Sequence, residues 1–335
     1  MSVRIATYNI KWFDDHFNED NSLKLSGKSE KTLQAVKHVF ELIDADLIAI
    51  IEAPNTTTTS GVQSTVEKLE NFAQWAGLST RKAMIGFPSG GRQEIAVLYN
   101  PDKMTLTHDP KGRFDSRSNP PFNGEFFYDT DDDDIKEVYR HYRPPLEARV
   151  DLASGDVFYI MGVHTKSKGI FNSVDQVHLE RETRRNRLKL YAECAWIRRR
   201  VEDWLQEEKK FAVMGDINDG PGMDLYEMRY GRSAVELIMG ELFEPDFILR
   251  NYVGRPVWTR FGWAPASARF KDRITETYVN VLIDHILASP NLPIIGEKPA
   301  KVWNPYEASD LTEHKEQFTI ASDHFPVTLD LEFGS

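Results

Sequence analysis

Short apolar runs rich in β-branched residues recur along the chain, and they predict a protein built largely from β-strands. Several of these runs are apolar at nearly every position instead of every second one, which is typical of strands buried on both faces. The predicted strands are, in chain order, "VRIATYNI" (3–10), "DLIAIIE" (46–52), "EIAVLYN" (94–100), "LEARVDL" (146–152), "DVFYIMGVHT" (156–165), "FAVMGDI" (211–217), "NVLIDHILAS" (280–289) and "HFPVTLDLEF" (324–333).

Helical spacing occurs between some of these strands. Ser64 is followed three residues later by Glu67 in "STVEKLENFAQW", a capping-box pattern that predicts the start of a helix. Strands interleaved with helices, together with strand-only stretches, predict sheets packed on each other and covered by helices. Two further helices are predicted where apolar residues recur every three or four positions: Leu33, Val36, Phe40 and Ile43 in one, and Leu190, Cys194, Ile197, Val201 and Trp204 in the other.

No fixed-period repeat and no Pro/Gly/Ser-rich linker divides the 335 residues, so we predict one domain over residues 1–335. Two stretches, near 111–139 and 252–280, have the composition of surface excursions. The first contains the acidic run "DTDDDD" (129–134), which we interpret as a solvated loop because it lacks the glycine and glutamate of an EF-hand calcium loop.

The second excursion contains three aromatic residues within 258–263: Trp258, Phe261 and Trp263. Local packing is the simpler interpretation of such a loop. Stacking on a nucleic-acid base, or wedging into a groove, is the functional alternative that the sequence leaves open.

Composition limits the class of protein. Hydrophobic residues make up 41% of the chain and charged residues 28%, and no run approaches the ~18 apolar residues of a membrane span, so we expect none. The single cysteine, Cys194, excludes an internal disulfide, and nothing resembling a signal peptide precedes "VRIATYNI". The default expectation is a reducing, cytoplasmic compartment.

The charge balance argues against a protein that binds nucleic acid through its overall charge. Asp and Glu total 52 against 41 Lys and Arg, a formal net charge of −11. An enzyme is less affected, because a bound metal ion supplies positive charge locally while distant acids are screened.

Polar residues suited to chemistry stand at or just beyond the ends of the predicted strands, where a rigid scaffold can hold a site. Taken singly, Asp216 and Asn218 have a plain structural explanation as an Asx turn. Glu52 and Asp284 are harder to explain this way, because each follows apolar residues and a buried carboxylate is costly unless something positive pairs with it. The full set is Asn9, Glu52, His164, Asp216, Asn218, Asp284, Asp323 and His324.

Carboxylates, amides and histidines without a cysteine cluster suit a hard divalent ion, Mg²⁺ or Mn²⁺, and therefore phosphate chemistry. Taken in chain order, the strand-end residues make the sequence resemble the endonuclease/exonuclease/phosphatase superfamily, which comprises the deoxyribonuclease-I-like phosphodiesterases and phosphatases. The blocks that carry the resemblance are "TYNIKW", "IAIIEA", "GRQEIAVLYN", "YRPPLEARV", "GVHTKSKG", "VMGDINDGPG", "LIDHILAS" and "SDHFPV". They span Asn9 to His324, and they imply a four-layered α/β sandwich of two mainly antiparallel sheets flanked by helices.

The resemblance also implies the metal ligands. Glu52 would be the principal ligand, with Asn9 and Asp323 near or on the ion. Where abasic-site endonucleases often carry a second carboxylate, two residues after the asparagine, this chain has Lys11. A phosphate contact and a surface lysine are both open for Lys11.

Catalytic roles follow in the same way. Asp216 would position or deprotonate the attacking water, and Asn218 would hold a phosphate oxygen. His324 would face the phosphate while Asp284 orients its imidazole.

Two further matches are to the deoxyribonuclease branch of the superfamily. His164 resembles that branch's second histidine, and Glu94 in "GRQEIAV" would be its carboxylate partner. Arg143 resembles a phosphate-contacting arginine. Lys166 and Lys168 beside His164 would suit a polyanionic substrate, although a solvated loop also explains them.

We therefore predict a Mg²⁺- or Mn²⁺-dependent phosphodiester hydrolase, a nuclease cleaving DNA more readily than RNA by in-line attack of an activated water. The alternative enzyme is a phosphatase or phosphodiesterase acting on a small phosphorylated molecule or lipid headgroup. A catalytically silent binding module is the alternative from another class. No protein partner can be inferred.

Overall fold

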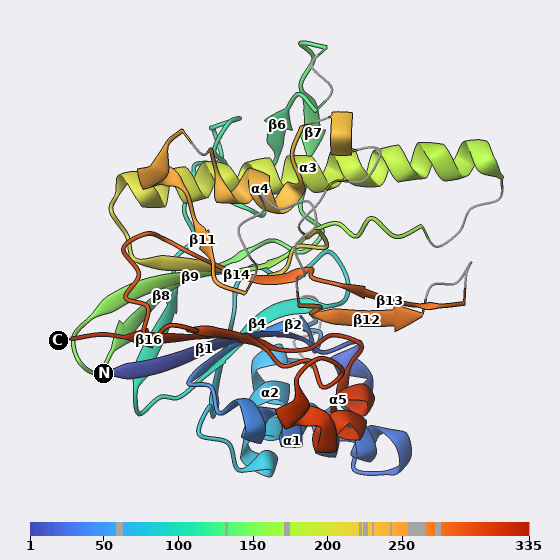
Figure 1. Ribbon diagram of the computed structural model, residues 1–335, viewed down its shortest axis with the longest axis vertical. Helices are drawn as coiled ribbons and strands as arrows, with labels where there is room; N and C mark the ends of the chain where they lie inside the picture. The colour runs from blue at the N-terminus through green and yellow to red at the C-terminus, as the bar shows by residue number, and fades with distance from the viewer. Residues whose placement is uncertain are drawn as a thin grey trace.

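Two six-stranded sheets lie face to face in the computed structural model, and helices cover the outer face of each, which gives four layers (Figure 1). This is the predicted α/β sandwich. The structure describes residues 1–57, 63–130, 133–170, 175–220, 223, 227–229, 231–241, 243–253, 265–271 and 276–334.

The first sheet has the strand order β15-β16-β1-β2-β4-β3. Its strands are β1 (Ser2–Asn9), β2 (Leu47–Ala53), β3 (Lys82–Ile85), β4 (Glu94–Tyr99), β15 (Ala300–Val302) and β16 (Val327–Glu332). The second sheet has the order β11-β14-β10-β9-β8-β5. Its strands are β5 (Met104–His108), β8 (Leu146–Leu152), β9 (Val157–His164), β10 (Phe211–Asp216), β11 (Arg250–Asn251) and β14 (Asp284–Ala288).

Each sheet contains one parallel pair joined by a crossover helix. In the first sheet β1 and β2 are parallel and α1 (Gly27–Ile43) connects them, and in the second β9 and β10 are parallel and α3 (Gln176–Gln206) connects them. The other neighbouring pairs described in these sheets are antiparallel. Because parallel strands end at the same edge of a sheet, each pair delivers two consecutive strand ends to one place.

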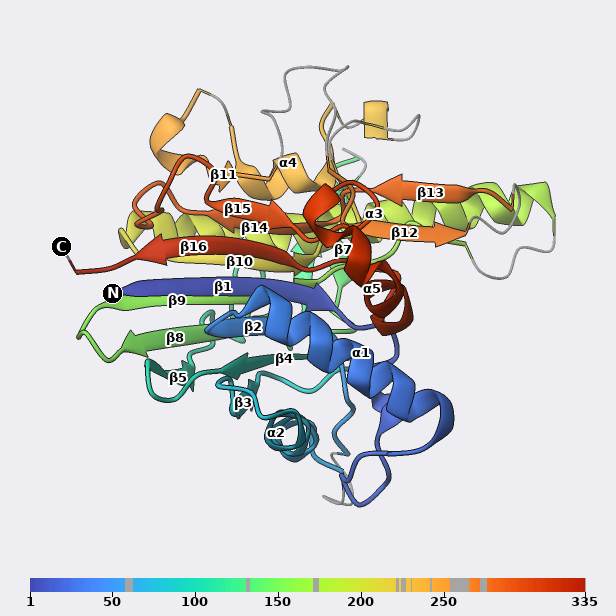
Figure 2. The same ribbon diagram turned by 60° about the horizontal axis from the view of Figure 1, so that its bottom comes forward.

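Helices α1, α2 (Thr65–Ala76) and α5 (Lys315–Ala321) cover the first sheet, and α3 and α4 (Ala234–Met239) cover the second (Figures 1 and 2). All three helices expected from the sequence are therefore present. The Ser64 side chain caps α2 by accepting the Glu67 N–H, whereas the Glu67 carboxylate accepts from Asn21 instead of closing the capping box. The short 3₁₀ helices are η1 (Phe13–His16), η2 (Glu227–Arg229), η3 (Pro245–Phe247) and η4 (Ser309–His314).

The predicted strand 280–289 is wrong as a single strand. It divides into β13 (Tyr278–Val281), which pairs with β12 (Ala268–Lys271) in a separate hairpin, and β14 of the second sheet. The Ser267 hydroxyl accepts the backbone N–H groups of Ile283 (3.0 Å) and Asp284 (2.9 Å), so a side chain replaces the ladder where the chain changes sheet. Apolar periodicity continues through this break, and the pattern therefore could not reveal it.

The two excursions are partly ordered. Residues 111–139 contain the hairpin of β6 (Phe126–Tyr128) and β7 (Glu137–Tyr139), and 252–280 contains most of the β12–β13 hairpin. Residues 131–132 of the acidic run and the aromatic residues 258–263 lie outside the described residues. Within the described part of the chain, no helix is long and apolar enough to cross a membrane.

A buried ion pair attaches α3 to the second sheet. Arg200 on α3 is fully buried, and its guanidinium contacts the Glu147 carboxylate of β8, which is 1% exposed. Arg200 also donates to the Asn119 side chain (3.2 Å) and to the Pro120 carbonyl (3.3 Å). Burial raises the pKa of Glu147 to about 7, although the charge and the hydrogen bond of Arg200 act to lower it.

We expect Arg200→Ala to lower the free energy of unfolding by about 3–5 kcal/mol, because it leaves a buried carboxylate without a counter-charge. The neighbouring Arg199, half-exposed on the same helix, provides the control: Arg199→Ala should cost about 0.5 kcal/mol or less. Urea unfolding followed by circular dichroism measures both. Equal losses in the two variants would contradict this interpretation.

Candidate active site

The ends of the two parallel pairs meet at one edge of the sandwich and bring the strand-end residues together. In the second sheet, Asp216 on β10 pairs directly with His164 on one side and with Asp284 on the other. In the first sheet, Asn9 ends β1 beside Ile51, the residue before Glu52. The antiparallel strand β16 starts at this edge, which places His324, three residues before its first residue, there too.

A hydrogen bond between the sheets fixes Asp216. The Asn9 side-chain amide donates to Asp216 Oδ2 over 3.0 Å, and both side chains are buried. Asp216 Oδ1 accepts the Asn218 backbone N–H over 2.8 Å, and the Asn218 amide donates to the Thr165 carbonyl over 3.1 Å. The Asx turn considered as a plain structural explanation is therefore present, and it also holds the carboxylate at the site.

Two glycines permit the close packing of this strand end. A Cβ on Gly215, at φ 148°, would lie 1.9 Å from the Val163 carbonyl oxygen of the neighbouring strand. A Cβ on Gly220 would lie 2.0 Å from the Leu282 carbonyl oxygen, just before β14. Larger residues would push β9, β10 and β14 apart and separate the side chains they carry.

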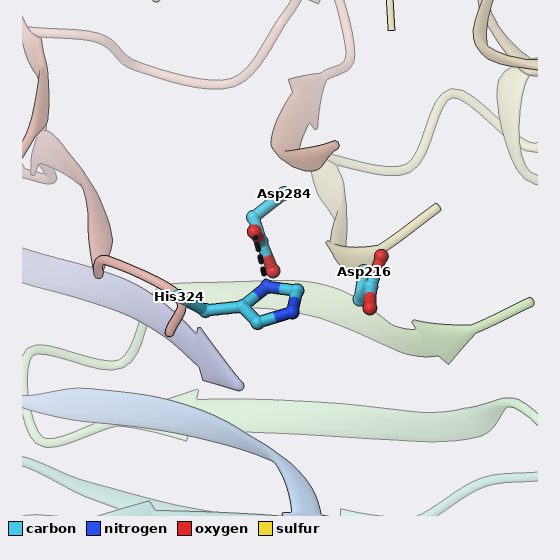
Figure 3. A group of neighbouring side chains, drawn as sticks. All are labelled: Asp216, Asp284 and His324. Carbon is cyan, nitrogen blue, oxygen red and sulfur yellow. Dashed lines mark hydrogen bonds and ion pairs between the residues drawn. The ribbon is translucent and has the colours of Figure 1, made fainter. Parts of the chain in front are cut away.

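His324 and Asp284 form the expected histidine–carboxylate pair (Figure 3). His324 Nδ1 lies 2.8 Å from Asp284 Oδ2, and the Ser267 hydroxyl donates to the same oxygen over 2.8 Å. Burial alone would lower the pKa of His324, but the charge of Asp284 and its hydrogen bond, helped by Asp216 and Asp323, raise it to about 10. The imidazole is therefore a cation at neutral pH.

The pKa of Asp216 is raised as well, but for a carboxylate this favours the uncharged form. Burial raises the pKa of Asp216, and the charge of Asp284 raises it further. A carboxylate with a raised pKa is a better base than an exposed one. Ligand-type atoms of Asp216, Asp284 and His324 all lie within 4.8 Å of one another, so the site concentrates its charge in a small volume.

The second predicted histidine–carboxylate pair is absent. Glu94 accepts the Ser89 N–H (2.7 Å) and hydroxyl (3.2 Å), while Nδ1 of His164 is buried without a hydrogen-bond partner among the described residues. His164 Nε2 lies 3.7 Å from Asp216 Oδ2. Burial, with the nearby positive charge of Arg143, holds the pKa of His164 well below its usual value. His164 is therefore neutral, because burial outweighs any carboxylate nearby.

Glu52 lies across the site, at a β-bulge where the register of β2 and β4 shifts. Its backbone has φ 59°, a conformation that is uncommon for residues other than glycine and that turns the side chain away from the alternating pattern of the strand. Glu52 Oε2 accepts the Trp12 N–H over 2.9 Å. Asn9 Oδ1 is buried and has no hydrogen-bond partner among the described residues. An orphaned amide oxygen beside a carboxylate fits a hard divalent cation.

Asp323 has a partner that the sequence did not reveal. Lys11 Nζ lies 2.5 Å from Asp323 Oδ2, and both side chains are partly exposed. Lys11 thus neutralises a carboxylate that the sequence analysis expected near the ion.

Arg143 is held by a chain of polar contacts that sequence reasoning missed. Arg143 Nη1 donates to Gln93 Oε1 (2.8 Å), and the Gln93 N–H donates to Asn55 Oδ1 (2.9 Å). Asn55 donates its side-chain amide to Asp14 (2.7 Å), which also pairs with the buried Lys68 (2.7 Å). These residues lie in loops between strands, where polar residues are common, so the sequence did not predict the contacts. The one indication was the position of Gln93 next to Glu94.

The two lysines near His164 differ. Lys168 contacts the buried carboxylates of Asp219 and Glu227, so it is structural and does not face a substrate. The Lys166 backbone N–H donates to Glu193 Oε2 over 2.7 Å, and its half-buried side chain has a pKa lowered by burial and by neighbouring cations.

Comparison with known proteins supports the fold. No protein-family model matches the sequence, and no curated protein sequence matches it. Among solved structures, the endonuclease/exonuclease/phosphatase from Bacteroides vulgatus is similar with a TM-score of 0.53 at 17% identity, covering 100% of both chains. TDP2 from Caenorhabditis elegans is similar with a TM-score of 0.51 at 12% identity, covering 99% of this chain and 76% of that one. The chain therefore has the fold of the endonuclease/exonuclease/phosphatase, or deoxyribonuclease-I-like, superfamily.

Proposed function

We propose that the protein is a divalent-metal-dependent phosphodiester hydrolase, and that it is a nuclease cleaving DNA. The observation that carries the proposal is the meeting of a buried carboxylate, Asp216, and a cationic histidine, His324, at the ends of strands from two different sheets. A base and a fixed positive charge are what in-line attack of water on an anionic phosphate requires.

Each group has a role that follows from its contacts. Asp216, whose pKa burial raises, accepts the proton of the attacking water, and Asn9 fixes the orientation of its carboxylate. His324, held by Asp284, donates a charged hydrogen bond to a non-bridging phosphate oxygen. Because His164 is neutral, it forms a single hydrogen bond at the phosphate without adding a positive charge.

The metal site would be formed by Glu52 and Asn9, with Asp323 nearby but paired to Lys11. Mg²⁺ or Mn²⁺ bound there would neutralise charge that develops on the phosphate oxygens. Arg143, whose Nε is buried without a partner among the described residues, would contact a phosphate, and Lys166 would contact the phosphate beside it. Two cations placed for neighbouring phosphates favour a polynucleotide over a small phosphoester.

We expect Asp216→Asn to reduce Mg²⁺- or Mn²⁺-dependent cleavage of plasmid DNA by about 10²–10⁴-fold, because the base is lost while the shape is kept. Asp246, an exposed carboxylate on η3, provides the matched control: Asp246→Asn should cleave like the wild type. Agarose gels of supercoiled plasmid measure the rate. The proposal is rejected if the wild-type protein leaves plasmid intact, and release of phosphate from small phosphoesters would then favour the phosphatase alternative.

The metal site has its own test. Glu52→Gln keeps the volume of the side chain and removes the charge, so it should weaken Mn²⁺ binding at least about tenfold in isothermal titration calorimetry. Glu332→Gln, at an exposed position on β16, should leave binding unchanged. Unaltered affinity in Glu52→Gln would remove Glu52 from the site, and no binding by the wild type would favour a silent binding module.

The charge on His324 predicts a pH dependence. Its pKa is about 10 in the folded protein and about 6.5 in an unfolded chain, so its contribution to stability is complete below about pH 6.5 and is lost as pH rises towards 10. Asp284→Asn should therefore destabilise the metal-free protein more at pH 6 than at pH 10. Histidine NMR of the wild-type protein measures the pKa directly, and titration of His324 near 6.5 would contradict the assignment.

A further inference from the structure

We propose that a basic tract running from Arg143 along α3, through Lys166, Lys189 and Arg185, binds successive phosphates of a nucleic-acid strand beside the scissile bond. The inference rests on the proposed function and deepens it, because it assigns a polymeric substrate and the surface that recognises it. Lys189 and Arg185 have no part in the catalytic arrangement described above.

The tract begins at the catalytic residues. The Thr165 carbonyl accepts from Asn218 (3.1 Å) and from Arg143 Nη2 (3.3 Å). Lys166 follows Thr165 directly, so the first two cations of the tract are fixed relative to Asp216 through backbone contacts.

A buried carboxylate joins this loop to α3. Glu193 is almost fully buried on α3; its Oε2 accepts the Lys166 N–H over 2.7 Å, and its Oε1 lies 3.8 Å from Lys189 Nζ. One carboxylate thus holds two lysines from different elements side by side. The pKa of Lys166 is lowered by burial first, and then by the positive charges of Lys189, Arg143 and Arg185.

The tract continues outward along the helix. Arg185 precedes Lys189 by one turn and therefore lies on the same face of α3. Its side chain is 72% exposed, and its carboxylate partner Glu182 is on the same helix. The Asn186 side chain donates to the Gly169 carbonyl over 3.0 Å, so the loop after Lys166 also follows α3. Figure 1 shows the N-terminal half of α3 extending past the sheets, on the same side as the β12–β13 hairpin.

The charge of this surface contrasts with that of the whole chain. A protein with a net charge of −11 repels a polyanion at long range, so cations concentrated on one path select where a phosphate backbone can approach. A small phosphoester would reach Arg143 alone. Lys189 and Arg185 each have a carboxylate neighbour on α3, Glu193 and Glu182. Beyond these ion pairs, a substrate would contact the two cations only if further phosphates follow the scissile one.

The test measures salt dependence of binding, so it needs no catalysis. All proteins carry Asp216→Asn and are kept metal-free, and anisotropy of a labelled duplex of about 20 base pairs gives the binding constant as NaCl is varied. Lys189→Ala/Arg185→Ala should reduce the slope of log K against log [salt] by about 1.8, because each lost phosphate contact removes about 0.9. Lys31→Ala/Lys298→Ala removes the same charge from exposed positions away from α3, with Lys31 on α1 over the first sheet, and should leave the slope unchanged.

The outcomes separate the two proposals. An unchanged slope in Lys189→Ala/Arg185→Ala overturns the tract, and the proposed function stands if the wild-type protein still cleaves plasmid. Equal reductions in both double variants also overturn it, because overall charge would then explain the effect. If the double variant binds duplex normally but loses binding to vesicles containing an inositol phospholipid, the surface recognises a lipid headgroup instead. A wild-type protein that neither binds duplex nor cleaves plasmid fails the proposed function itself.

Discussion

The hydrogen bond from Asn9 to Asp216 is the contact on which the rest of the site depends, because it joins the two sheets at the edge where their parallel strands end. Each sheet alone presents an incomplete set of groups. Glu52 and Asn9 belong to the first sheet, and His164, Asp216 and Asp284 to the second. Packing of the sheets, driven by the apolar residues between them, therefore also assembles the chemistry.

Burial then sets the charge of each group. The same loss of water that makes Asp216 harder to ionise would also discharge His324, but three carboxylates near His324, chiefly Asp284, reverse that effect. His164 is more deeply buried and has no carboxylate within hydrogen-bond distance, Asp216 being 3.7 Å away, so it stays neutral. Two histidines at one site thus carry different charges for a reason visible in their hydrogen bonds.

Much of the fold and of the candidate site could be predicted from the sequence. Apolar runs predicted the strands, because a buried strand must be apolar wherever it lies, and the spacing of Leu33 or Leu190 with later residues predicted helices for a similar reason. The strand ends identified Asn9, Asp216 and His324, because polar residues next to a buried strand must be hydrogen-bonded or have a function.

The remaining features depend on contacts between segments that are distant along the chain, and these contacts cannot be predicted from a single sequence. Glu94 was expected to pair with His164, but a serine five residues earlier satisfies its carboxylate. Lys168 was grouped with Lys166 by adjacency, although the backbone directs Lys168 into a buried acidic pair. The chain of contacts behind Arg143 and the ion pair of Lys11 with Asp323 likewise require the fold before they exist.

The central claim is that residues from both sheets hold one divalent cation beside Asp216. A crystal grown with Mn²⁺ and measured at the manganese absorption edge tests this most directly, because anomalous scattering locates the ion independently of activity. The account predicts a peak within about 2.0–2.3 Å of oxygens from Glu52 and Asn9. A peak elsewhere, with these two oxygens left without an ion, would contradict it.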